Sequence, residues 1–498
     1  MKYNLGTLFS KICKKNLNKK ALILKNKEYT YKFFDINSNL ISGYFNNTLK
    51  LKSQDVVAIE ATKSLESYLF LLSCLKIGVS YVFIDPDSPN ERIKKIFKTI
   101  KPKIFFINNI KYKVNSLEKV KILNIKKVHN LSKMKKHLLN NKIFNFSSDK
   151  IAYIMFTSGS TGDPKGASIT HDNLINFIKW TQTEYKIKTN DNITNLNPLH
   201  FDNSVFDIYS SFFNGATLVP FEKKEIIDTK SLITNIIKNK ISIWFSVPSL
   251  LVFILNFKSF STSSFIYLKK IIFGGEGFPK SKLKELYNLT RKKKVELYNV
   301  YGPTECTCIC SSYKINKNDF KKNEMKRFAP FGKKMIKNFY YFIDNKKNYK
   351  GQDIGELILG GPNVGKGYYN NKKETKKRFI KNFKHTKNKK DIVYRTGDLV
   401  YVDKKNRNIY FSNRADDQIK YLGHRIELGE IQQNLNKIKE IKECYVEFRK
   451  KNLNSSGEIL CWLSHSSNLS LIRDKILKLL PKYMMPSRFI ELKILSKS

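Results

Sequence analysis

The sequence is poor in acidic residues. Only 42 Asp and Glu stand against 92 Lys and Arg, which gives a formal net charge of +50. The basic residues are scattered along the whole chain and mixed with Asn and Ile. They therefore lack the clustering that is typical of a nucleic-acid-binding face, and we interpret them as a solvated surface. A field of this sign would still attract anionic ligands and an acidic protein partner.

Cysteine is also scarce, and the seven cysteines show no framework spacing. An odd number without regular spacing argues against a disulfide scaffold and suits a reducing cytoplasm. Cys306, Cys308 and Cys310 alternate with Thr307 and Ile309, so all three would share one face of a strand. Zinc sites usually show C-x-x-C pairs. We therefore interpret the alternation as one side of a strand.

Long apolar runs are absent as well. Residues 4–10 are too short for the apolar region of a signal peptide, and they lead into Lys14 and Lys15. The longest uncharged run, 241–257, is interrupted by serines and a proline. It predicts a buried strand, a turn and the start of a helix rather than a membrane span. We expect a cytoplasmic protein without a membrane span.

A chain of 498 residues is too long for one core, so two or more domains are expected. From Asp55 onward, segments with strand and helix patterns alternate, which predicts an α/β fold with helices on the faces of the sheets. Residues 355–369 are β-rich and punctuated by glycine, as in a small barrel-like subdomain. We expect a large domain over 1–415 and a small α+β domain over 416–498.

The most informative stretch runs from Tyr153 to Gly166. A β-prone run feeds a loop of small hydroxylated residues and glycines that ends at Lys165. Glycines let successive backbone N–H groups turn toward one point and hold phosphate oxygens, and Lys165 adds one mobile charge. A Gly/Ser surface loop is the alternative. However, Pro164 fixes the direction in which the lysine leaves the loop, and the spacing differs from the Walker loop. The loop residues are Thr157, Ser158, Gly159, Ser160, Thr161 and Gly162.

The string Thr-Ser-Gly-Ser-Thr-Gly-x-Pro-Lys-Gly at 157–166 resembles the signature of the adenylate-forming (AMP-forming) synthetase family. Within that family the chain looks most like amino-acid adenylation domains and D-alanine–D-alanyl carrier protein ligases. Further matching segments follow in the family's order across nearly the whole chain, among them 197–207, 296–305, 394–398 and 413–427.

The resemblance implies an enzyme that activates a carboxylic acid with ATP and Mg²⁺. Such a site must grip the triphosphate, hold a metal, aim the acid at the α-phosphorus and neutralise developing charge. By resemblance, the loop and Lys165 would hold the β- and γ-phosphates. In the segment Tyr301–Glu305, which includes Gly302, Tyr301 would stack on adenine, Thr304 would contact the α-phosphate and Glu305 would bind Mg²⁺. Asn299 would hydrogen-bond the adenine edge.

Two further residues complete the implied nucleotide site. Asp398 would accept both ribose hydroxyls, a role that suits the two oxygens of one carboxylate. Arg414, with its permanent charge, would contact the ribose and phosphate region. Taken singly, Asp398 would be a turn residue, Arg414 a surface arginine and Glu305 a solvated acid. The occurrence of all three residues in the family's order favours the nucleotide site over these separate interpretations.

Asp202 narrows the implied substrate, because the amino-acid-activating branch has an aspartate here that pairs with the substrate's α-ammonium. The alternative is a helix cap. His200 and Phe201 are candidates for an aromatic gate, although a histidine here can be a packing residue. The implied pocket predicts a small, mostly apolar side chain. D-alanine ligases commonly carry cysteine where Gly274 stands, which leaves size and chirality open. The pocket residues are Asn203, Phe206, Ser249, Ile272, Gly274, Val300, Cys308 and Ile309.

Three features of the C-terminal region complete the resemblance. Asp416 matches the hinge at which the family's small domain swings between two half-reactions. Gly423 matches the glycine of the loop that lines the pantetheine tunnel. The family's closing Asn-Gly-Lys would fall about four residues beyond Ser498. We therefore expect weak adenylation and an intact transfer step. Adenylation at full rate would instead mean that another cation, such as Lys497 or Lys420, replaces that lysine.

The sequence thus predicts an ATP-dependent ligase. It would adenylate a small amino acid and pass the aminoacyl group to the pantetheine thiol of a separate acidic carrier protein. Two alternatives stay open: an acyl- or aryl-CoA synthetase, and a nucleotide-binding homologue with impaired turnover. The amino acid, its chirality, the pathway and the oligomeric state stay open as well.

Overall fold

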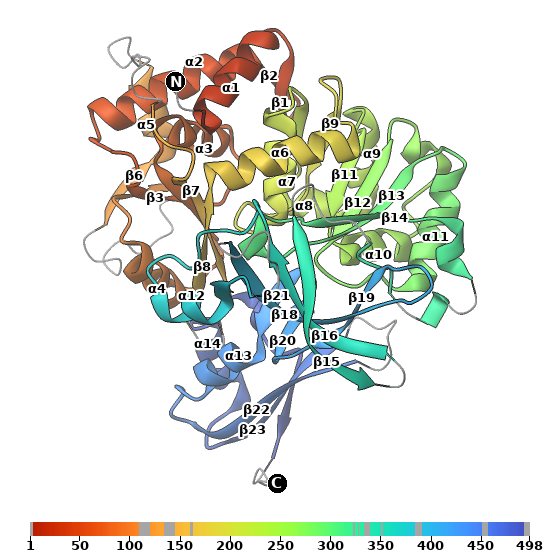
Figure 1. The fold of residues 1–498 in the computed structure, drawn as a ribbon. Coiled ribbons are helices and arrows are strands. Elements are labelled where there is room, and N and C mark those ends of the chain that lie inside the picture. Colours follow the sequence, from red (N-terminus) through yellow and green to blue (C-terminus); the bar gives the residue numbers. More distant parts are fainter. Residues whose placement is uncertain are drawn as a thin grey trace.

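The computed structural model describes residues 3–108, 120–133, 145–159, 163–321, 324–326, 328–332, 339–349, 352–383, 391–450 and 457–492. The chain forms a large N-terminal domain of sheets and helices and a smaller C-terminal domain with its own strands (Figure 1). The predicted α/β fold class is confirmed. The predicted boundary between residues 415 and 416 falls in the connection between strands β19 and β20.

An eight-stranded sheet forms one half of the large domain. Its central strands are parallel, and β2 and β14 pair antiparallel at its two edges. In spatial order the strands are β14 (Ser311–Lys314), β13 (Glu296–Tyr301), β12 (Lys270–Gly274), β11 (Ile243–Ser246), β9 (Asn192–Asn195), β10 (Thr217–Pro220), β1 (Lys20–Leu24) and β2 (Lys27–Thr30).

A six-stranded sheet forms the other half, and it is parallel except for its last pair. That antiparallel pair, β7 and β8, brackets the predicted phosphate loop. In spatial order the strands are β6 (Lys121–Asn124), β5 (Ile104–Ile107), β3 (Val56–Glu60), β4 (Ser80–Ile84), β7 (Ile151–Thr157) and β8 (Lys165–Thr170).

Helices cover both faces of these sheets, as expected for largely parallel strands. Thr170 caps α6 with a reciprocal capping box that includes Asn173. The helices of the large domain are α1 (Leu5–Lys15), α2 (Tyr31–Asn47), α3 (Leu65–Ile77), α4 (Asn90–Ile100), α5 (Ile125–Ser132), α6 (His171–Tyr185), α7 (Asn203–Phe212), α8 (Lys223–Ile227), α9 (Thr229–Lys238), α10 (Pro248–Asn256) and α11 (Lys280–Arg291).

Alternate residues of single strands belong to different cores, which shows how the layers are stacked. In β3, Val57 and Ile59 join a large cluster that includes residues of α1, α2, α3, α6 and α7 and of both sheets. Val56 and Ala58 pack instead with α4. On the eight-stranded sheet, Trp244 faces a third cluster with α9, α10 and α11. Because successive side chains of a strand point to opposite faces, the largest cluster joins the two sheets.

A third, antiparallel sheet follows in sequence and occupies the position predicted for the small subdomain. It packs against the carboxyl ends of the larger sheets (Figure 1), and the short helix α12 (Lys372–Arg378) precedes one of its strands. The strands are β15 (Tyr340–Tyr349), β16 (Gln352–Gly360), β17 (Phe379–Lys381), β18 (Ile392–Val402) and β19 (Ile409–Arg414).

The smaller C-terminal domain has its own core, which includes Ile426, Leu463 and Met484. It starts with a two-stranded hairpin that reaches back toward the large domain. Its elements are β20 (Gln418–Tyr421), β21 (His424–Glu427), α13 (Leu428–Leu435), β22 (Ile441–Arg449), β23 (Glu458–His465), α14 (Leu469–Leu477) and β24 (Arg488–Glu491).

One prediction about local structure was wrong. Cys306, Cys308 and Cys310 do not lie on a strand, because residues 304–306 form a 3₁₀ turn and Thr307 and Cys308 have φ of 61° and 71°. The chain turns sharply here before β14 begins at Ser311. All seven cysteines are nevertheless buried free thiols.

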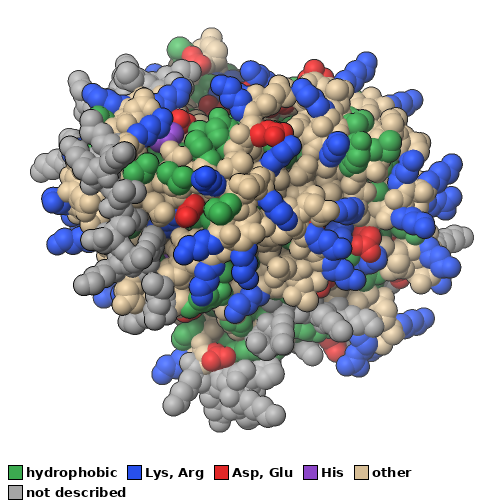
Figure 2. Space-filling model, turned by 90° about the horizontal axis from the view of Figure 1, so that it is seen from above, with side chains coloured by type: hydrophobic (Ala, Val, Ile, Leu, Met, Phe, Trp, Pro, Cys, Tyr) green, Lys and Arg blue, Asp and Glu red, His purple; other side chains and the backbone are tan. Residues whose placement is uncertain are grey.

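Two global predictions can be compared with the structure. Over the described residues, no helix is both long and apolar enough to cross a bilayer. Lys and Arg side chains are spread over the face seen in Figure 2 and are not gathered into one patch. This agrees with the scattered lysines of the sequence.

Candidate active site

The predicted residues converge where the carboxyl ends of parallel strands face the small domain. Thr157 ends β7, Gly274 ends β12 and Tyr301 ends β13. The antiparallel sheet contributes Asp398 from β18 and Arg414 from the end of β19, which pair across the sheet. Ligands of open α/β sheets bind beyond the carboxyl ends of the strands, so this edge is the candidate active site.

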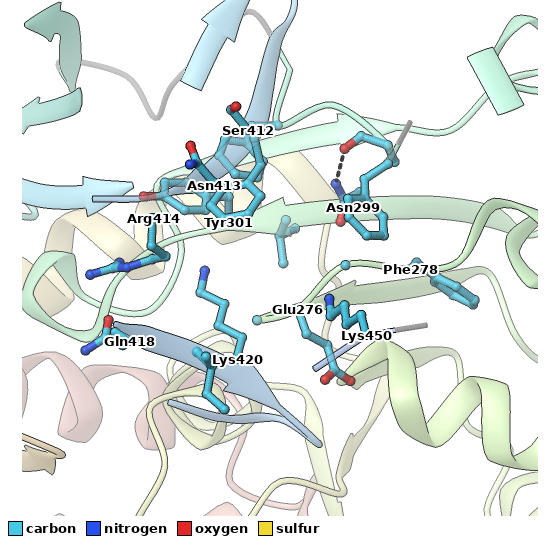
Figure 3. Close-up of a pocket in the computed structure, with 18 of the residues that line it drawn as sticks. Glu276, Phe278, Asn299, Tyr301, Ser412, Asn413, Arg414, Gln418, Lys420 and Lys450 are labelled. Atoms are coloured by element: carbon cyan, nitrogen blue, oxygen red, sulfur yellow. Dashed lines mark hydrogen bonds between the residues drawn. The ribbon is translucent and has the colours of Figure 1, made fainter. Parts of the chain in front are cut away.

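A cavity of about 340 Å³ lies at this edge, between the large domain and the hairpin (Figure 3). Its walls include the backbone of 275–277, Asn299, Val300 and Tyr301 from one side and Asn413, Arg414 and Lys420 from the other. Tyr301 stacks on Phe331, with ring centroids 4.0 Å apart. Lys420 projects from β20 toward the same ring, with Nζ 5.2 Å from its centroid (Figure 3).

A hydrogen-bonded chain joins Tyr301 to the predicted hinge. The Tyr301 hydroxyl donates to Asp398 Oδ2 at 2.5 Å, and Arg414 Nη1 donates to Asp398 Oδ1 at 2.8 Å. Arg414 also donates to both carboxylate oxygens of Asp416, at 2.8 and 2.9 Å. Burial alone would raise the pKa of Asp398, but the charges of Lys420 and Arg414 outweigh it and keep the pKa low. The predicted ribose carboxylate is therefore ionised.

The Asn299 side chain lines the same cavity, but its amide nitrogen is engaged. It donates to the backbone oxygen of Pro330 at 2.9 Å and to that of Ala329 at 3.4 Å. These bonds orient the amide within the cavity wall, as Figure 3 shows for one of them.

A second, smaller cavity of about 60 Å³ contains Asp202. Asp202 precedes α7, but its side chain makes no cap hydrogen bond, which argues against the capping alternative. Its Oδ2 instead accepts a hydrogen bond from Thr304 Oγ1 at 2.6 Å. Burial raises the pKa of Asp202 above its ordinary value, because a hydroxyl stabilises a buried carboxylate less than a cation would. The other residues around this cavity include Asn203, Gly302, Arg425 and Gly423.

Five predicted pocket residues belong to the main core: Phe206, Ile272, Val300, Cys308 and Ile309. Phe206 packs edge-on against Tyr185 and Phe245. Gly274 lies against Val300, where a Cβ atom would come within 2.5 Å of the Val300 carbonyl oxygen. A cysteine could not replace this glycine without a shift of β13, which gives a physical reason for the departure from the D-alanine ligase pattern.

The candidate aromatic gate joins residues of both domains. His200 lies against Phe201, and Phe201 contacts His424 of the hairpin, with ring centroids 4.7 Å apart. His424 in turn stacks flat on Tyr483, at 4.0 Å and 6°. Burial lowers the pKa of His424 to about 4, so this stack is uncharged near neutral pH.

The described part of the phosphate loop and Lys165 contact the small domain and helix α12. Ser158 Oγ donates to the Arg425 carbonyl oxygen at 2.7 Å, and the Gly159 N–H donates to Glu430 Oε2 at 3.3 Å. Lys165 Nζ donates to Glu374 Oε2 at 2.7 Å. Ser160, Thr161 and Gly162 lie outside the described residues.

Glu305, the predicted metal ligand, is buried between two partners. Tyr368 donates to its Oε1 at 2.7 Å, and Arg425 Nη1 lies 2.8 Å from its Oε2. Burial would raise the pKa of Glu305, but Arg425 and then the Tyr368 hydroxyl lower it below its usual value. Among the described residues, no cluster of three His, Cys, Asp or Glu could hold a metal by itself. One ionised carboxylate fits a Mg²⁺ ion that is shared with substrate phosphates, once Arg425 has moved away.

The hairpin of the small domain is seated in the site around Gly423. Its N–H donates to Glu276 Oε2 at 3.1 Å, and the other Glu276 oxygen accepts from the Ser249 N–H at 2.7 Å. Gly423 has a φ of 78°, and a Cβ atom there would lie 2.8 Å from Val247 Cγ1. Only glycine allows this close approach without strain.

Fold and site together define an adenylate-forming ligase. The chain belongs to the AMP-binding enzyme family, whose sequence model matches residues 9–369, and enzymes of this class use ATP. Among similar proteins, a D-alanine--D-alanyl carrier protein ligase of Lacticaseibacillus casei (strain BL23) is 28% identical over 498 residues, covering 98% of this chain and 95% of its own. The ligase of the same name from Listeria monocytogenes serotype 4a (strain HCC23) is 28% identical over 472 residues, covering 93% and 90%.

Solved structures share the fold at lower identity. An artificially fused adenylation–PCP di-domain, NpsA-ThdA from Klebsiella oxytoca, superposes with a TM-score of 0.84 at 20% identity, covering 98% of this chain and 94% of its own. The Vibrio cholerae adenylation domain AlmE in complex with glycyl-adenosine-5'-phosphate gives a TM-score of 0.83 at 20% identity, covering 99% and 95%.

Three residues of this site have no role predicted from the sequence. Arg425 lies within the quoted segment Asn413–Glu427, and Glu276 follows a Gly-Gly pair after a strand, so a signal existed for both. Glu374 stands in a lysine-rich stretch of α12 that carries no motif. Only the contact with Lys165 reveals it.

Proposed function

We propose that this protein adenylates a small amino acid with ATP and transfers the aminoacyl group to the phosphopantetheine thiol of a separate, acidic carrier protein. The single observation that carries the proposal is Asp202, a partly buried carboxylate that lines a cavity of about 60 Å³. A carboxylate that is partly withdrawn from water is stabilised by a cation partner, and the α-ammonium of an amino acid would supply one. The small volume favours a small side chain.

The remaining roles are part of the same proposal. Thr304, which donates to Asp202, lines the smaller cavity with it and would contact the α-phosphate. Asp398 and Arg414 would hold the ribose, and Tyr301 with the 275–277 backbone would hold the adenine. Lys165, with Thr157 and the loop up to Gly162, would bind the outer phosphates. When bound, Mg²⁺ at Glu305 would neutralise phosphate charge.

The seated hairpin supports the transfer half of the proposal. Gly423 lies against Val247 and Glu276, beside the cavity that contains Asp202. Asp416 would act as the hinge between a large domain over 1–415 and a lid over 416–498. The seven buried thiols support a reducing, cytoplasmic setting, and the names of the similar ligases support D-alanine as a candidate substrate.

The experiment that tests the proposal is an ATP–pyrophosphate exchange screen over both enantiomers of the amino acids. We expect exchange with one or a few small amino acids, followed by loading of a phosphopantetheinylated acidic carrier protein. Exchange supported only by a fatty or aromatic acid would contradict the proposal, and so would nucleotide binding without exchange for any acid.

A further inference from the structure

The candidate phosphate lysine is already paired with an internal carboxylate. Lys165 Nζ lies 2.7 Å from Glu374 Oε2, and the two side chains are only 7% and 10% exposed. Lys165 begins β8 of the six-stranded sheet, whereas Glu374 belongs to α12 beside the third sheet. A lysine at this depth requires an anion, because an unpaired buried charge is costly.

Several contacts of α12 hold Glu374 in this position. The helix is capped by Asn371, whose side chain accepts from the Glu374 N–H at 3.1 Å. One helical turn further, Arg378 donates to Asp416 Oδ2 at 2.9 Å. Glu374 and Arg378 are four residues apart and therefore share a face of the helix. One face of α12 thus contacts both the phosphate lysine and the predicted hinge.

We propose that Glu374 is a positioning residue that competes with pyrophosphate for Lys165. When outer phosphates are absent, Glu374 holds the lysine; when they bind, they must displace its carboxylate and lie beside its negative charge. Glu374 therefore weakens pyrophosphate binding and favours pyrophosphate release. The inference rests on the proposed function, because it takes Lys165 to be the residue that grips the outer phosphates.

The test is a titration of the full chain with sodium pyrophosphate and, separately, with AMP, at one fixed MgCl₂ concentration. In E374Q the lysine loses its internal anion, so we expect pyrophosphate to bind on the order of ten-fold more tightly. AMP has no outer phosphates, so its affinity should stay within about two-fold. E374D keeps the charge on a shorter side chain and should give an intermediate pyrophosphate affinity.

Two controls make the result specific. E285Q removes the carboxylate of the surface ion pair between Lys282 and Glu285 on α11. It should leave the affinities for pyrophosphate and for AMP unchanged. Adding K165A to E374Q should abolish the gain. If E374Q does not fold, the pyrophosphate affinity of E374D relative to the wild type tests the inference.

Equal or weaker pyrophosphate binding by E374Q, or an equal gain for AMP, would overturn the inference while leaving the proposed function intact. A wild-type chain that binds neither pyrophosphate nor AMP would overturn both.

Discussion

Arg425 and Glu305 form an ion pair across 120 residues of sequence, with Nη1 2.8 Å from Oε2. Glu305 comes from the turn after β13 of the large domain, and Arg425 comes from β21 of the small one. The pair engages the carboxylate that we propose as the Mg²⁺ ligand. Under the proposed function, the arrangement therefore fits the transfer step, which follows the departure of pyrophosphate and its metal.

Replacing Arg425 by Gln should slow transfer to the carrier more than it slows adenylation. Removing one partner of a buried charge pair typically costs about 2–5 kcal/mol. Here that cost would destabilise the orientation in which the hairpin contacts the large domain. We expect carrier loading from a supplied aminoacyl-adenylate to fall roughly ten-fold or more, with pyrophosphate exchange little changed. The control is R449Q, which removes the ion pair between Arg449 and Glu447 at the surface of β22. A parallel loss of both half-reactions would contradict this assignment.

Gly423→Ala should also affect transfer selectively. The new Cβ would lie 2.8 Å from Val247 Cγ1, at a φ of 78° that costs an alanine about 1–2 kcal/mol. We expect carrier loading to fall by roughly ten-fold or more. The double variant G423A/V247A removes the clashing methyl groups and should recover part of the rate, with V247A alone as the reference. No recovery in the double variant would mean that packing on Val247 is not the cause.

Asp202→Asn should weaken recognition of the amino group without affecting ATP. The substrate ammonium would lose a desolvated anionic partner worth roughly 2–4 kcal/mol. The KM for the amino acid found in the screen should rise steeply, whereas ATP affinity should not change. The variant should also lose its preference for that amino acid over the analogue without the amino group. An unchanged KM would refute the amino-acid assignment.

His171 predicts a specific pH dependence of stability. It lies at the start of α6, where Nδ1 accepts from the Leu5 N–H at 3.3 Å, and burial lowers its pKa to about 3. The unfolded chain binds this proton near pH 6.5 and the folded chain does not. The contribution of neutral His171 to the free energy of unfolding is therefore complete above about pH 6.5. It is lost progressively as the pH falls toward 3.

Comparison with H171N isolates this contribution, because Asn can accept the same hydrogen bond but does not titrate. Between pH 7 and pH 5, the free energy of unfolding of the wild type should fall by roughly 2 kcal/mol more than that of H171N. Denaturant unfolding at both pH values measures this. Parallel losses in the two proteins would show that His171 does not stay neutral.

Local sequence determined much of this protein. Alternating strand and helix patterns predicted the α/β class, because burial on one face of an element requires a fixed period of apolar residues. The Gly- and Ser-rich loop before Lys165 and the segment 301–305 could be predicted as a phosphate site and a nucleotide site, because their expected chemistry depends on neighbouring residues. The same local reasoning failed at Cys306–Cys310, where alternation imitated a strand although the backbone turns with positive φ.

The tertiary structure alone decided which charges meet. Nothing in the sequence links Glu374 to Lys165, or Arg425 to Glu305, because those pairs join separate sheets and separate domains. Nor does the sequence show that Val300 excludes a side chain at Gly274. Such contacts depend on how helices and strands pack against one another. The energies of these contacts depend on burial, and a residue becomes buried only when the chain folds.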